Sequence, residues 1–484
     1  MGTLALSAAT ALRLGVQLAI LPVLARFVGP QEYGLVALAL PFVMFANVLS
    51  EGGMTNALGR QTDVSWRLES TVFWLAGGVG AVVAVFCGLL AWPMGDVMRE
   101  PRLPWLIAAL TPILVLNALA TVSNARIIRE GRFYVFAGGD LIATAVSATV
   151  AIAAASQGAG AWSLVAQQLS LWICKFIWVT VASKVTIRLY CRPREAIDLV
   201  RFGLHSIGST FSDFTARNLD NMIVGLVLSA AALGHYAMAY QIVRIPDLLI
   251  SGPLYLYIFS AVARTTAFDP SGVRDLAVRA VRLAATALAP LFCGLALSAD
   301  LAVPLVLGGQ WDGVISPLAL LSGAGFAFSM CSVVSAILMG HGLSSLQFRI
   351  SLILGVATVG AVALSARYGV AVVSAVLAVT TLTVAMVYLS QIVFVLRARA
   401  LDLLLAFKPA VAGLVVMVLA LTLVRREIGE LHETLQFIVV VAAGGLGYAL
   451  TVGLVSGRVL LQDLRAFLAA HSDAPALAVE AVAV

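Results

Sequence analysis

Charged residues in this chain are confined almost entirely to short segments between long apolar runs. Only 11% of the 484 residues are charged, and 61% are hydrophobic. A helix crosses the hydrocarbon core of a bilayer in about 20 apolar residues, since each residue rises about 1.5 Å. The sequence therefore predicts an all-α polytopic membrane protein with about 14 transmembrane helices. The fourteen apolar runs are residues 4–28, 33–49, 71–94, 104–125, 134–155, 159–182, 203–228, 234–262, 283–307, 314–340, 348–366, 369–396, 409–424 and 435–455.

Basic residues fall mainly on one side of the predicted membrane. If the first residue is placed in the cytoplasm, only five of the 30 Lys and Arg residues lie in connections that follow odd-numbered runs. Five more lie within runs, and the other 20 lie in connections that follow even-numbered runs and in the tail, where Arg349, the second residue of its run, is counted with the connection before it. Cytoplasmic loops carry such an excess of basic residues. We therefore expect both termini to be cytoplasmic.

The same composition excludes several functions. The mean hydropathy of +1.02 excludes the soluble classes. The sequence pI of about 9.2 reflects the basic cytoplasmic loops, so we do not expect nucleic-acid binding. No G-x-x-x-x-G-K-[ST], H-E-x-x-H or G-x-S-x-G motif is present, and the five cysteines have no metal-like spacing. We expect no enzyme activity, no nucleotide-driven motor, no metal and no cofactor.

A weak internal repeat predicts how the helices are grouped. A shift of 200 residues brings residues 34–39 (GLVALA) onto residues 234–239 (GHYAMA). Six runs precede the seventh, so a second copy starting there has the same orientation in the membrane, and the two copies form a parallel repeat about a pseudo-two-fold axis. We expect two six-helix lobes, 1–200 and 201–396, followed by two additional transmembrane helices and a cytoplasmic tail in 397–484. The tail from Ser456 is expected to be unstructured or weakly helical.

Charged side chains inside the apolar runs are the candidate functional residues. A basic side chain at a helix centre costs about 2.5–3.5 kcal/mol to insert, so it must pair, face water or snorkel to the interface. Arg26 and Lys175 lie near helix ends and can snorkel. Arg13 lies deeper and shares a helical face with Thr10 and Gln17. No carboxylate accompanies Arg13 on its own helix, so we expect its charge to be free for a ligand.

The seventh and eighth runs carry further charges, and two interpretations of them stay open. One is that they form internal ion pairs, above all Asp213 with Arg217 and Arg244 with Asp247. The other is a hydrated cavity that accepts an anionic ligand. In that cavity the candidate substrate-binding residues are Arg13, Gln17, Arg217, Asn221 and Arg244, and the candidate ion-coupling or gating residues are Asp213, Asp220 and Asp247.

Three short segments resemble signatures of a known family. Residues 24–35 (LARFVGPQEYGL) resemble a "LaR-lGp-eyGl" signature, residues 218–225 (NLDNMIVG) an "n-lD-iiig" segment, and residues 233–240 (LGHYAMAY) an "lG-Ya-Ay" segment. These patterns are typical of bacterial polysaccharide transporters, the flippases of O-antigen, capsule and exopolysaccharide repeat units. They belong to the multidrug/oligosaccharidyl-lipid/polysaccharide (MOP) exporter superfamily. The matching signature residues are Arg26, Gly29, Tyr33, Gly34, Gly234 and Tyr236.

This resemblance implies a V-shaped pair of six-helix lobes that alternate between inward-open and outward-open states in the bacterial inner membrane. The implied cargo is an undecaprenyl-diphosphate-linked oligosaccharide, and the implied partners are membrane lipids, a polysaccharide polymerase and a chain-length regulator. Intramembrane arginines suit this cargo, because a guanidinium can make two parallel hydrogen bonds to a phosphate. Energy would come from an ion gradient, the membrane potential or removal of the product.

Two other functions stay open at this point. A drug/cation antiporter of the same superfamily would use Asp213 and Asp220 for proton or sodium coupling, although the intramembrane arginines oppose a cationic cargo. A membrane glycosyltransferase or polysaccharide polymerase generally needs a sizeable periplasmic loop, and all predicted external loops are short.

Overall fold

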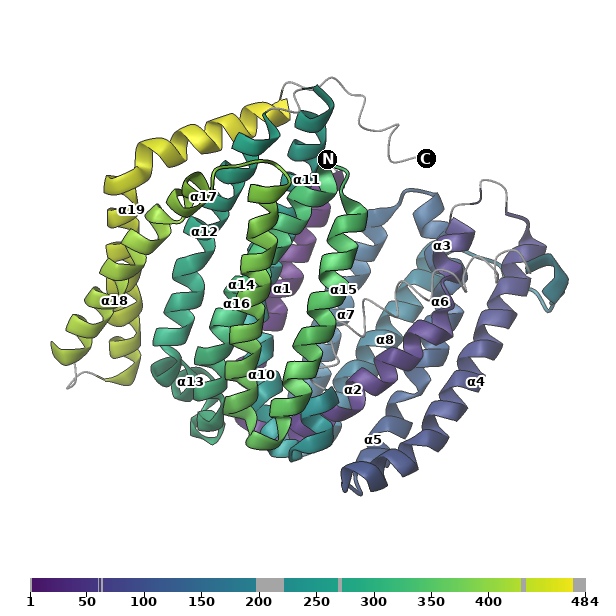
Figure 1. Cartoon of the computed structure of the whole chain (residues 1–484). Coiled ribbons are helices and arrows are strands. Elements are labelled where there is room, and N and C mark those ends of the chain that lie inside the picture. The colour runs from purple at the N-terminus through teal and green to yellow at the C-terminus, as the bar shows by residue number, and fades with distance from the viewer. Residues whose placement is uncertain are drawn as a thin grey trace. The chain divides into compact units, whose positions relative to one another are not determined.

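The computed structural model describes residues 2–59, 61, 64–196, 222–268, 272–427 and 432–472. Every regular element in these ranges is helical (Figure 1), as the sequence predicted. The α-helices are α1 (Gly2–Phe27), α2 (Pro30–Glu51), α3 (Met54–Gly59), α4 (Trp66–Met98), α5 (Leu103–Leu110), α6 (Pro112–Arg129), α7 (Phe133–Ser156), α8 (Ala161–Ser183), α10 (Ala230–Pro246), α11 (Gly252–Phe268), α12 (Val273–Leu297), α13 (Ala299–Leu307), α14 (Ile315–Gly340), α15 (Ser344–Ser365), α16 (Val370–Phe394), α17 (Ala400–Ala406), α18 (Lys408–Glu427) and α19 (Glu433–Ser472). Short 3₁₀ or π turns form η1 (Pro193–Ala196), η2 (Asp247–Ser251), η3 (Gly309–Val314) and η4 (Ala366–Tyr368).

The apolar helices coincide with the predicted membrane-spanning runs. Within the described residues, twelve helical segments are long and apolar enough to cross a membrane, from Pro30–Glu51 to Glu433–Ala466. They correspond to the predicted runs two to six and eight to fourteen. Helix α1 covers the first run, and most of the seventh run, residues 203–228, lies outside the described residues. The fold class, an all-α polytopic membrane protein, is confirmed.

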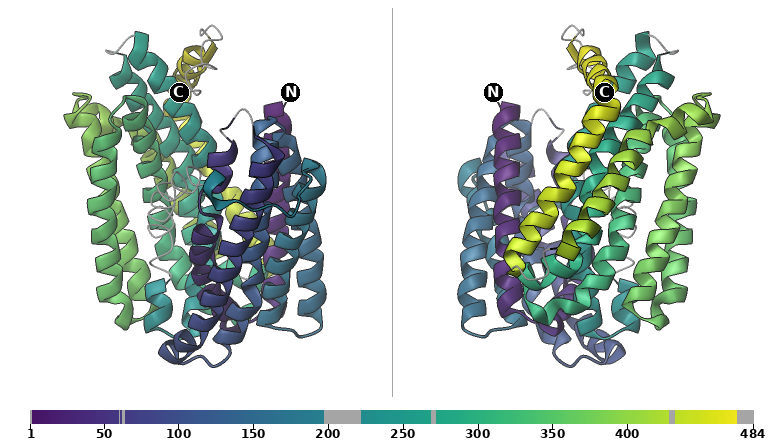
Figure 2. Two further views of the ribbon diagram at one scale, coloured as in Figure 1. Left: turned by 90° about the vertical axis from the view of Figure 1, so that its right-hand side faces the viewer. Right: turned by 90° about the vertical axis from the view of Figure 1, so that its left-hand side faces the viewer.

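Contacts between helices divide the chain into two units, Met1–Ala237 and Met238–Val484. In the first unit, α7 packs against both α1 and α8, and α6 contacts α2, α4 and α8 (Figure 2). Its core includes side chains of α5 and α6 that are at most 1% exposed, namely Leu106, Ile107, Leu110, Ile113 and Leu114. This packing places α1, α7 and α8 side by side, with α7 in the middle.

The signature glycines lie at a close helix contact inside the first unit. A Cβ atom added to Gly34 would overlap the carbonyl oxygen of Ala230, and one added to Gly234 would overlap the carbonyl oxygen of Pro30. Tyr236, also of the signature, is fully buried nearby on α10. These residues therefore allow the first turns of α2 and α10 to touch through their backbones, because only glycine leaves room for so close an approach.

Glu32 of the same signature segment joins three helix starts. Its two carboxylate oxygens accept hydrogen bonds from Arg102 Nη1 and Nη2 at 2.6 and 2.7 Å, a bidentate pair. Glu32 Oε2 also accepts from the backbone N–H of Ala161 at 2.9 Å, which would otherwise have no partner within α8. The hydrogen bond to Glu32 raises the pKa of Arg102 above its usual value. The carboxylate thus connects the start of α2 to the starts of α5 and α8.

In the second unit, α14 packs against α11, α12 and α16, and the pair formed by α18 and α19 packs against α12. Arg425 of α18 forms a bidentate ion pair with Asp300 of α13, at 2.9 and 2.8 Å. The Tyr448 hydroxyl of α19 donates to the Thr286 carbonyl of α12 at 2.7 Å. The two predicted extra helices are therefore anchored to this unit by directed polar contacts as well as by apolar packing.

The predicted tail is helical for most of its length. Helix α19 continues to Ser472, so the expectation of an unstructured or weakly helical tail from Ser456 is wrong for residues 456–472. Asp463 is only 4% exposed and accepts a hydrogen bond from Arg282 Nη1 of α12 at 2.7 Å. This contact holds the end of α19 against α12. Figure 1 shows that α19 bends along its length, and it contains the pair Ser456-Gly457, a kind of site at which helices kink.

Candidate functional site

Asp140 of α7 lies between two cationic side chains inside the first unit. Its Oδ2 atom is 2.8 Å from Arg13 Nη1 of α1, and its Oδ1 atom is 2.7 Å from Lys175 Nζ of α8. The three side chains are 31%, 32% and 29% exposed in the order Arg13, Asp140, Lys175. Two positive charges on partly exposed side chains therefore share one negative charge, which leaves an excess of one positive charge.

Local packing of α7 against α8 sets this geometry. A Cβ atom added to Gly139 would lie 2.5 Å from Trp178 Cδ1, so the missing side chain lets the Trp178 ring lie directly on α7. Trp178 Nε1 also donates a hydrogen bond to the Val135 carbonyl at 2.9 Å. Lys175 lies one helical turn before Trp178, and Asp140 follows Gly139. The contact of Trp178 with α7 therefore brings the Lys175 ammonium close to the Asp140 carboxylate.

A cavity of about 160 Å³ with both polar and apolar walls opens beside the ion pair between Asp140 and Lys175. Asn117 and Asn124 of α6 add amide groups to its wall, and Asn117 Nδ2 donates to Asn47 Oδ1 of α2 at 3.1 Å. Trp172 closes another side, with its ring centre 5.6 Å from Lys175 Nζ. A cavity of this size with several polar groups on its wall has room for several water molecules or for a polar ligand group.

The site lies at a common depth in its helices. Asp140 is seven residues from the start of α7, and Lys175 is eight residues from the end of α8. At 1.5 Å per residue, both lie roughly 10–12 Å from the same ends of these antiparallel helices. A charge at such a depth needs a partner or water. The Arg13 Nε atom is buried without a hydrogen-bond partner, so this guanidinium has donor capacity beyond its contact with Asp140.

The structure bears on two expectations about these residues. Arg13 was expected to carry a free charge, but Asp140 from another helix pairs with it. Lys175 lies near enough to a helix end to snorkel, but of the open alternatives it pairs, since its ammonium also contacts Asp140. The physical reason is the same in both cases, since a carboxylate inside a membrane-spanning helix recruits the cations of its neighbours.

Other predicted site residues lie elsewhere or outside the described chain. Gln17 is exposed on α1, and Arg244 is exposed on α10. Asp247 Oδ1 accepts a hydrogen bond from Ser329 Oγ of α14 at 3.2 Å, and no ion pair joins Arg244 to Asp247, both of which are described. The proposed Arg244–Asp247 pair is therefore wrong, and the π turn of η2 begins at Asp247 directly after Pro246. Asp213, Arg217, Asp220 and Asn221 lie outside the described residues.

Sequence reasoning missed Asp140, although a signal for it exists. It is the single charged residue of the predicted run 134–155, and the cost of inserting a lone carboxylate applies to it as to a lone arginine. Treating the acidic and basic residues of all runs together would have paired Asp140 with the two cations of the first lobe.

The family of the chain follows from comparison with known proteins. The model of a family described as polysaccharide biosynthesis protein matches residues 23–316, which is more than half of the chain. The chain belongs to this family. The resemblance inferred from the signature segments is thereby confirmed, and the match includes the α7 and α8 residues of the candidate site.

Relatives within the polysaccharide biosynthesis proteins extend over most of the chain. The succinoglycan biosynthesis transport protein ExoT of Rhizobium meliloti (strain 1021) is 25% identical over 456 residues, covering 93% of this chain and 91% of the relative. The lipopolysaccharide biosynthesis protein WzxC of Escherichia coli (strain K12) is 24% identical over 347 residues, covering 70% of each chain.

Solved structures show the same fold at lower sequence identity. The lipid II flippase MurJ in an inward closed conformation matches with a TM-score of 0.73 at 12% identity, covering 94% of this chain and 99% of MurJ. An inward-facing multidrug resistance MATE family transporter of the MOP superfamily matches with a TM-score of 0.60 at 17% identity, covering 78% of this chain and 94% of the transporter. This polysaccharide biosynthesis protein therefore has the fold of MOP-superfamily transporters.

Proposed function

We propose that this protein is a flippase that carries undecaprenyl-diphosphate-linked oligosaccharide repeat units across the inner membrane by alternating access. The observation that carries the proposal is the site formed by Arg13, Asp140 and Lys175, which holds excess positive charge, and of which Asp140 and Lys175 line a cavity together with Asn117 and Asn124. The names of the two relatives, which concern succinoglycan transport and lipopolysaccharide biosynthesis, support a polysaccharide precursor as cargo. The likeness to a lipid II flippase supports a lipid-linked form of it.

The geometry favours a mechanism in which the cargo exchanges partners with Asp140. Without cargo, the carboxylate holds Arg13 and Lys175 in place and reduces the cost of their burial. A diphosphate brings more negative charge and more acceptor oxygens than one carboxylate, so it can replace Asp140 at the guanidinium. The displaced carboxylate remains close by and competes for the same cations, which allows the cargo to leave.

The amide groups suit the rest of the cargo head group. Asn117 and Asn124 offer donors and acceptors to phosphate or sugar oxygens, and Trp172 offers a flat apolar face to a sugar ring. The lipid tail can stay in the bilayer. This arrangement disfavours a drug/cation antiporter at this site, because the carboxylate already faces two cations and the net charge repels a third.

The remaining parts of the proposal concern the residues and arrangement that the sequence predicted. Gln17, Arg217, Asn221 and Arg244 are further proposed cargo ligands, and Asp213, Asp220 and Asp247 are proposed coupling or gating residues. We also propose two six-helix lobes, 1–200 and 201–396, cytoplasmic termini, and a polysaccharide polymerase and chain-length regulator as partners. The excess of basic residues in the predicted cytoplasmic loops supports the orientation.

The experiment is deletion of the gene in its own cell, followed by measurement of lipid-linked repeat units on each membrane leaflet and of surface polymer. We expect repeat units to accumulate on the cytoplasmic leaflet and the polymer to disappear. Complementation with Arg13→Lys should restore part of the transport, because it keeps the charge, whereas Arg13→Gln should restore none. Persistence of the polymer in a strain with no second flippase would overturn the proposal, and an altered drug sensitivity instead would identify an antiporter.

A further inference from the structure

A second cationic cluster lies at the start of α4, well apart in sequence from the candidate site. The Arg188 guanidinium carbon is 4.6 Å from the ring centre of Trp66, and that of Arg67 is 5.6 Å from the same ring. Tyr190 packs edge-on against Trp66 at 5.6 Å between ring centres. The guanidinium carbon of Arg192 is 5.7 Å from the Tyr190 ring. We call these residues, Trp66, Arg67, Arg188, Tyr190 and Arg192, the Trp66 cluster.

The backbone of the cluster is fixed to α4. The Arg188 N–H donates to Ser70 Oγ at 3.1 Å, and Trp74 Nε1 donates to the Arg188 carbonyl at 3.0 Å. The Arg192 N–H donates to Thr71 Oγ1 at 3.3 Å. The segment between α8 and η1 is therefore held along the first turns of α4, and its arginines are positioned before any ligand arrives.

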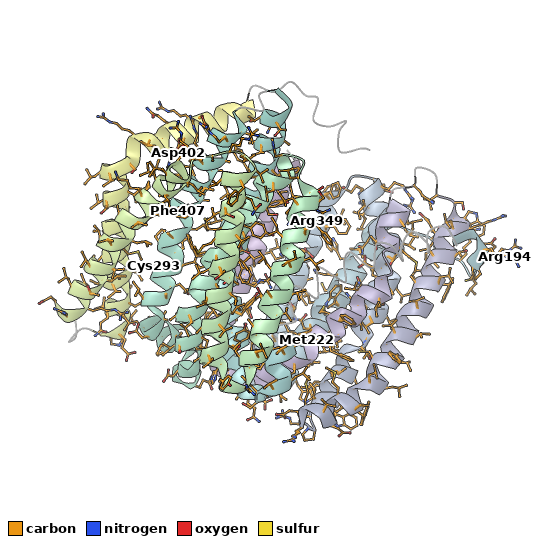
Figure 3. All side chains as sticks on the ribbon, in the orientation of Figure 1. Arg194, Met222, Cys293, Arg349, Asp402 and Phe407 are labelled. Atoms are coloured by element: carbon orange, nitrogen blue, oxygen red, sulfur yellow. The ribbon has the colours of Figure 1, made fainter. Side chains whose placement is uncertain are left out.

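The three guanidinium groups of the cluster have no counter-ion among the side chains that the structure describes. By contrast, the nearby Arg126 and Arg129 of α6 pair with the buried carboxylate of Glu69, at 3.9 and 3.1 Å. Arg194 of η1 lies further out at the edge of the first unit (Figure 3) and adds to the positive charge. Each guanidinium is attracted to the face of its ring, whereas the three like charges repel one another. An anion bound among them would remove that repulsion, so the arrangement suits an anionic ligand.

The position of the cluster identifies a membrane interface. Trp66 is the first residue of the membrane-spanning segment Trp66–Met98 and is 40% exposed. Trp and Tyr favour the level of the lipid head groups. Leu189, between two cluster residues, is 94% exposed, which suits an apolar side chain that reaches towards acyl chains. Both contributing segments belong to loops that the basic residues predict to be cytoplasmic.

We propose that the Trp66 cluster binds the phosphate head group of an anionic membrane lipid in the cytoplasmic leaflet. The planar guanidinium groups of Arg67, Arg188 and Arg192 donate to the phosphate oxygens, and the rings of Trp66 and Tyr190 keep these groups oriented. Leu189 contacts the acyl chains. The site does not depend on the cargo proposed above, since it shares no residue with Arg13, Asp140 or Lys175.

The test measures binding of short-chain phosphatidylglycerol to the purified full chain in detergent by native mass spectrometry, with diacylglycerol of equal chain length as the neutral lipid. The variant is Arg67→Gln with Arg188→Gln and Arg192→Gln. Its matched control is Arg349→Gln with Arg397→Gln and Arg399→Gln, which removes the same charge from other exposed arginines in or next to loops predicted to be cytoplasmic, Arg349 being labelled in Figure 3. A third arm adds inorganic phosphate as a competitor.

We expect the cluster variant to bind phosphatidylglycerol on the order of a hundredfold more weakly, since each basic residue at a membrane surface contributes about 1 kcal/mol, and the control to change by no more than about twofold. Equal losses in the two variants would overturn the site, as would equal binding of diacylglycerol. Displacement of the lipid by an equal concentration of inorganic phosphate would show a free-phosphate site instead. If the glutamine variant does not fold, the corresponding triple lysine variant decides, because an affinity equal to that of the wild type would overturn a stacked-arginine site.

Discussion

At the scale of single residues, the charge of the candidate site is decided by Asp140. With it, Arg13 and Lys175 together carry one excess positive charge, and without it they carry two. An ion pair buried in a protein can often be replaced by neutral groups with little loss of stability, whereas removal of one partner is costly. This difference separates a structural role of the three residues from a role in binding cargo.

A triple neutral variant makes use of that difference. Arg13→Gln with Asp140→Asn and Lys175→Gln keeps hydrogen-bonding groups on all three helices and removes every charge. We expect the protein to fold and insert normally but to lose transport of lipid-linked repeat units, because no cation remains for the diphosphate. Folding is measured by size-exclusion chromatography and thermal unfolding in detergent, and transport by the amount of surface polymer.

The matched control neutralises a different ion pair, through Arg425→Gln with Asp300→Asn. That pair connects α18 to α13 and lies outside the candidate site, so transport should continue in this variant. Normal transport by the triple neutral variant would mean that Arg13, Asp140 and Lys175 serve only to hold helices together.

The residue scale is also where sequence reasoning was least complete. Arg13 was selected as an intramembrane charge, but it was expected to be free, and its partner Asp140 lies 127 positions away on α7. No helical spacing reveals a contact of that kind. Arg244 and Asp247, by contrast, have a spacing that fits an ion pair, and the structure turns Asp247 to Ser329 instead. Local periodicity therefore identifies which charges are costly, while tertiary packing decides how each is neutralised.

At the scale of helices, apolar run length predicted the spans well because it reports a physical requirement of the bilayer. A segment in lipid must form all its backbone hydrogen bonds within itself, as a helix does. About 20 apolar residues are needed for such a helix to cross the hydrocarbon core. The prediction for the tail was wrong because it, too, relied on apolar run length. Residues 456–472 leave the apolar pattern, and their helix is held by the contact of Asp463 with α12, which pattern alone does not show.

The contact between α2 and α10 gives a prediction at this scale. Gly34→Ala would place a methyl group onto the backbone carbonyl of Ala230, which cannot move aside without shifting α10. We expect a loss of about 3 kcal/mol or more in stability, at the upper end of typical overpacking costs. Thermal unfolding in a single detergent measures it.

Gly88→Ala is the matched control, since a Cβ atom there meets nothing within 4 Å in the middle of α4. It should leave stability unchanged or raise it by up to about 1 kcal/mol, the helix-propensity difference between the two residues. Equal behaviour of the two variants would show that the close approach of α2 and α10 is not needed for folding.

The anchoring of α19 gives a second prediction for helices. Asp463→Asn keeps the shape of the buried side chain but leaves Arg282 without its charge partner, so we expect a loss of about 1–3 kcal/mol. Asp275→Asn changes an exposed carboxylate that, among the described residues, pairs only with its neighbour Arg274, and there we expect a change of less than about 1 kcal/mol. Thermal unfolding compares the two, and faster proteolysis after residue 456 in the first variant would locate the loss at the end of α19.

At the scale of the whole molecule, the distribution of basic residues is the strongest constraint on orientation. Twelve of the fourteen runs from which the alternation of sides was counted coincide with described spans, and the side of each connection stays a prediction. Two features of the first unit fit this assignment. The Trp66 cluster and the Glu69 ion pairs lie at the end of α4 that is predicted to be cytoplasmic, and Glu32 with Arg102 lies at the opposite, predicted periplasmic end.

Reporter fusions test this orientation along the whole chain. Alkaline phosphatase is active only in the periplasm, and green fluorescent protein fluoresces only in the cytoplasm. The two reporters therefore identify the side of each connection independently. Because at least four-fifths of the loop and tail arginines and lysines lie on one predicted side, translocation of those loops is unfavourable against the membrane potential. We expect periplasmic signals from fusions at Gly158, Ala231 and Gly429, and cytoplasmic signals at Arg129, Arg192 and Asp275. Opposite signals at two or more of these positions would contradict the topology, and with it the cytoplasmic placement of the Trp66 cluster.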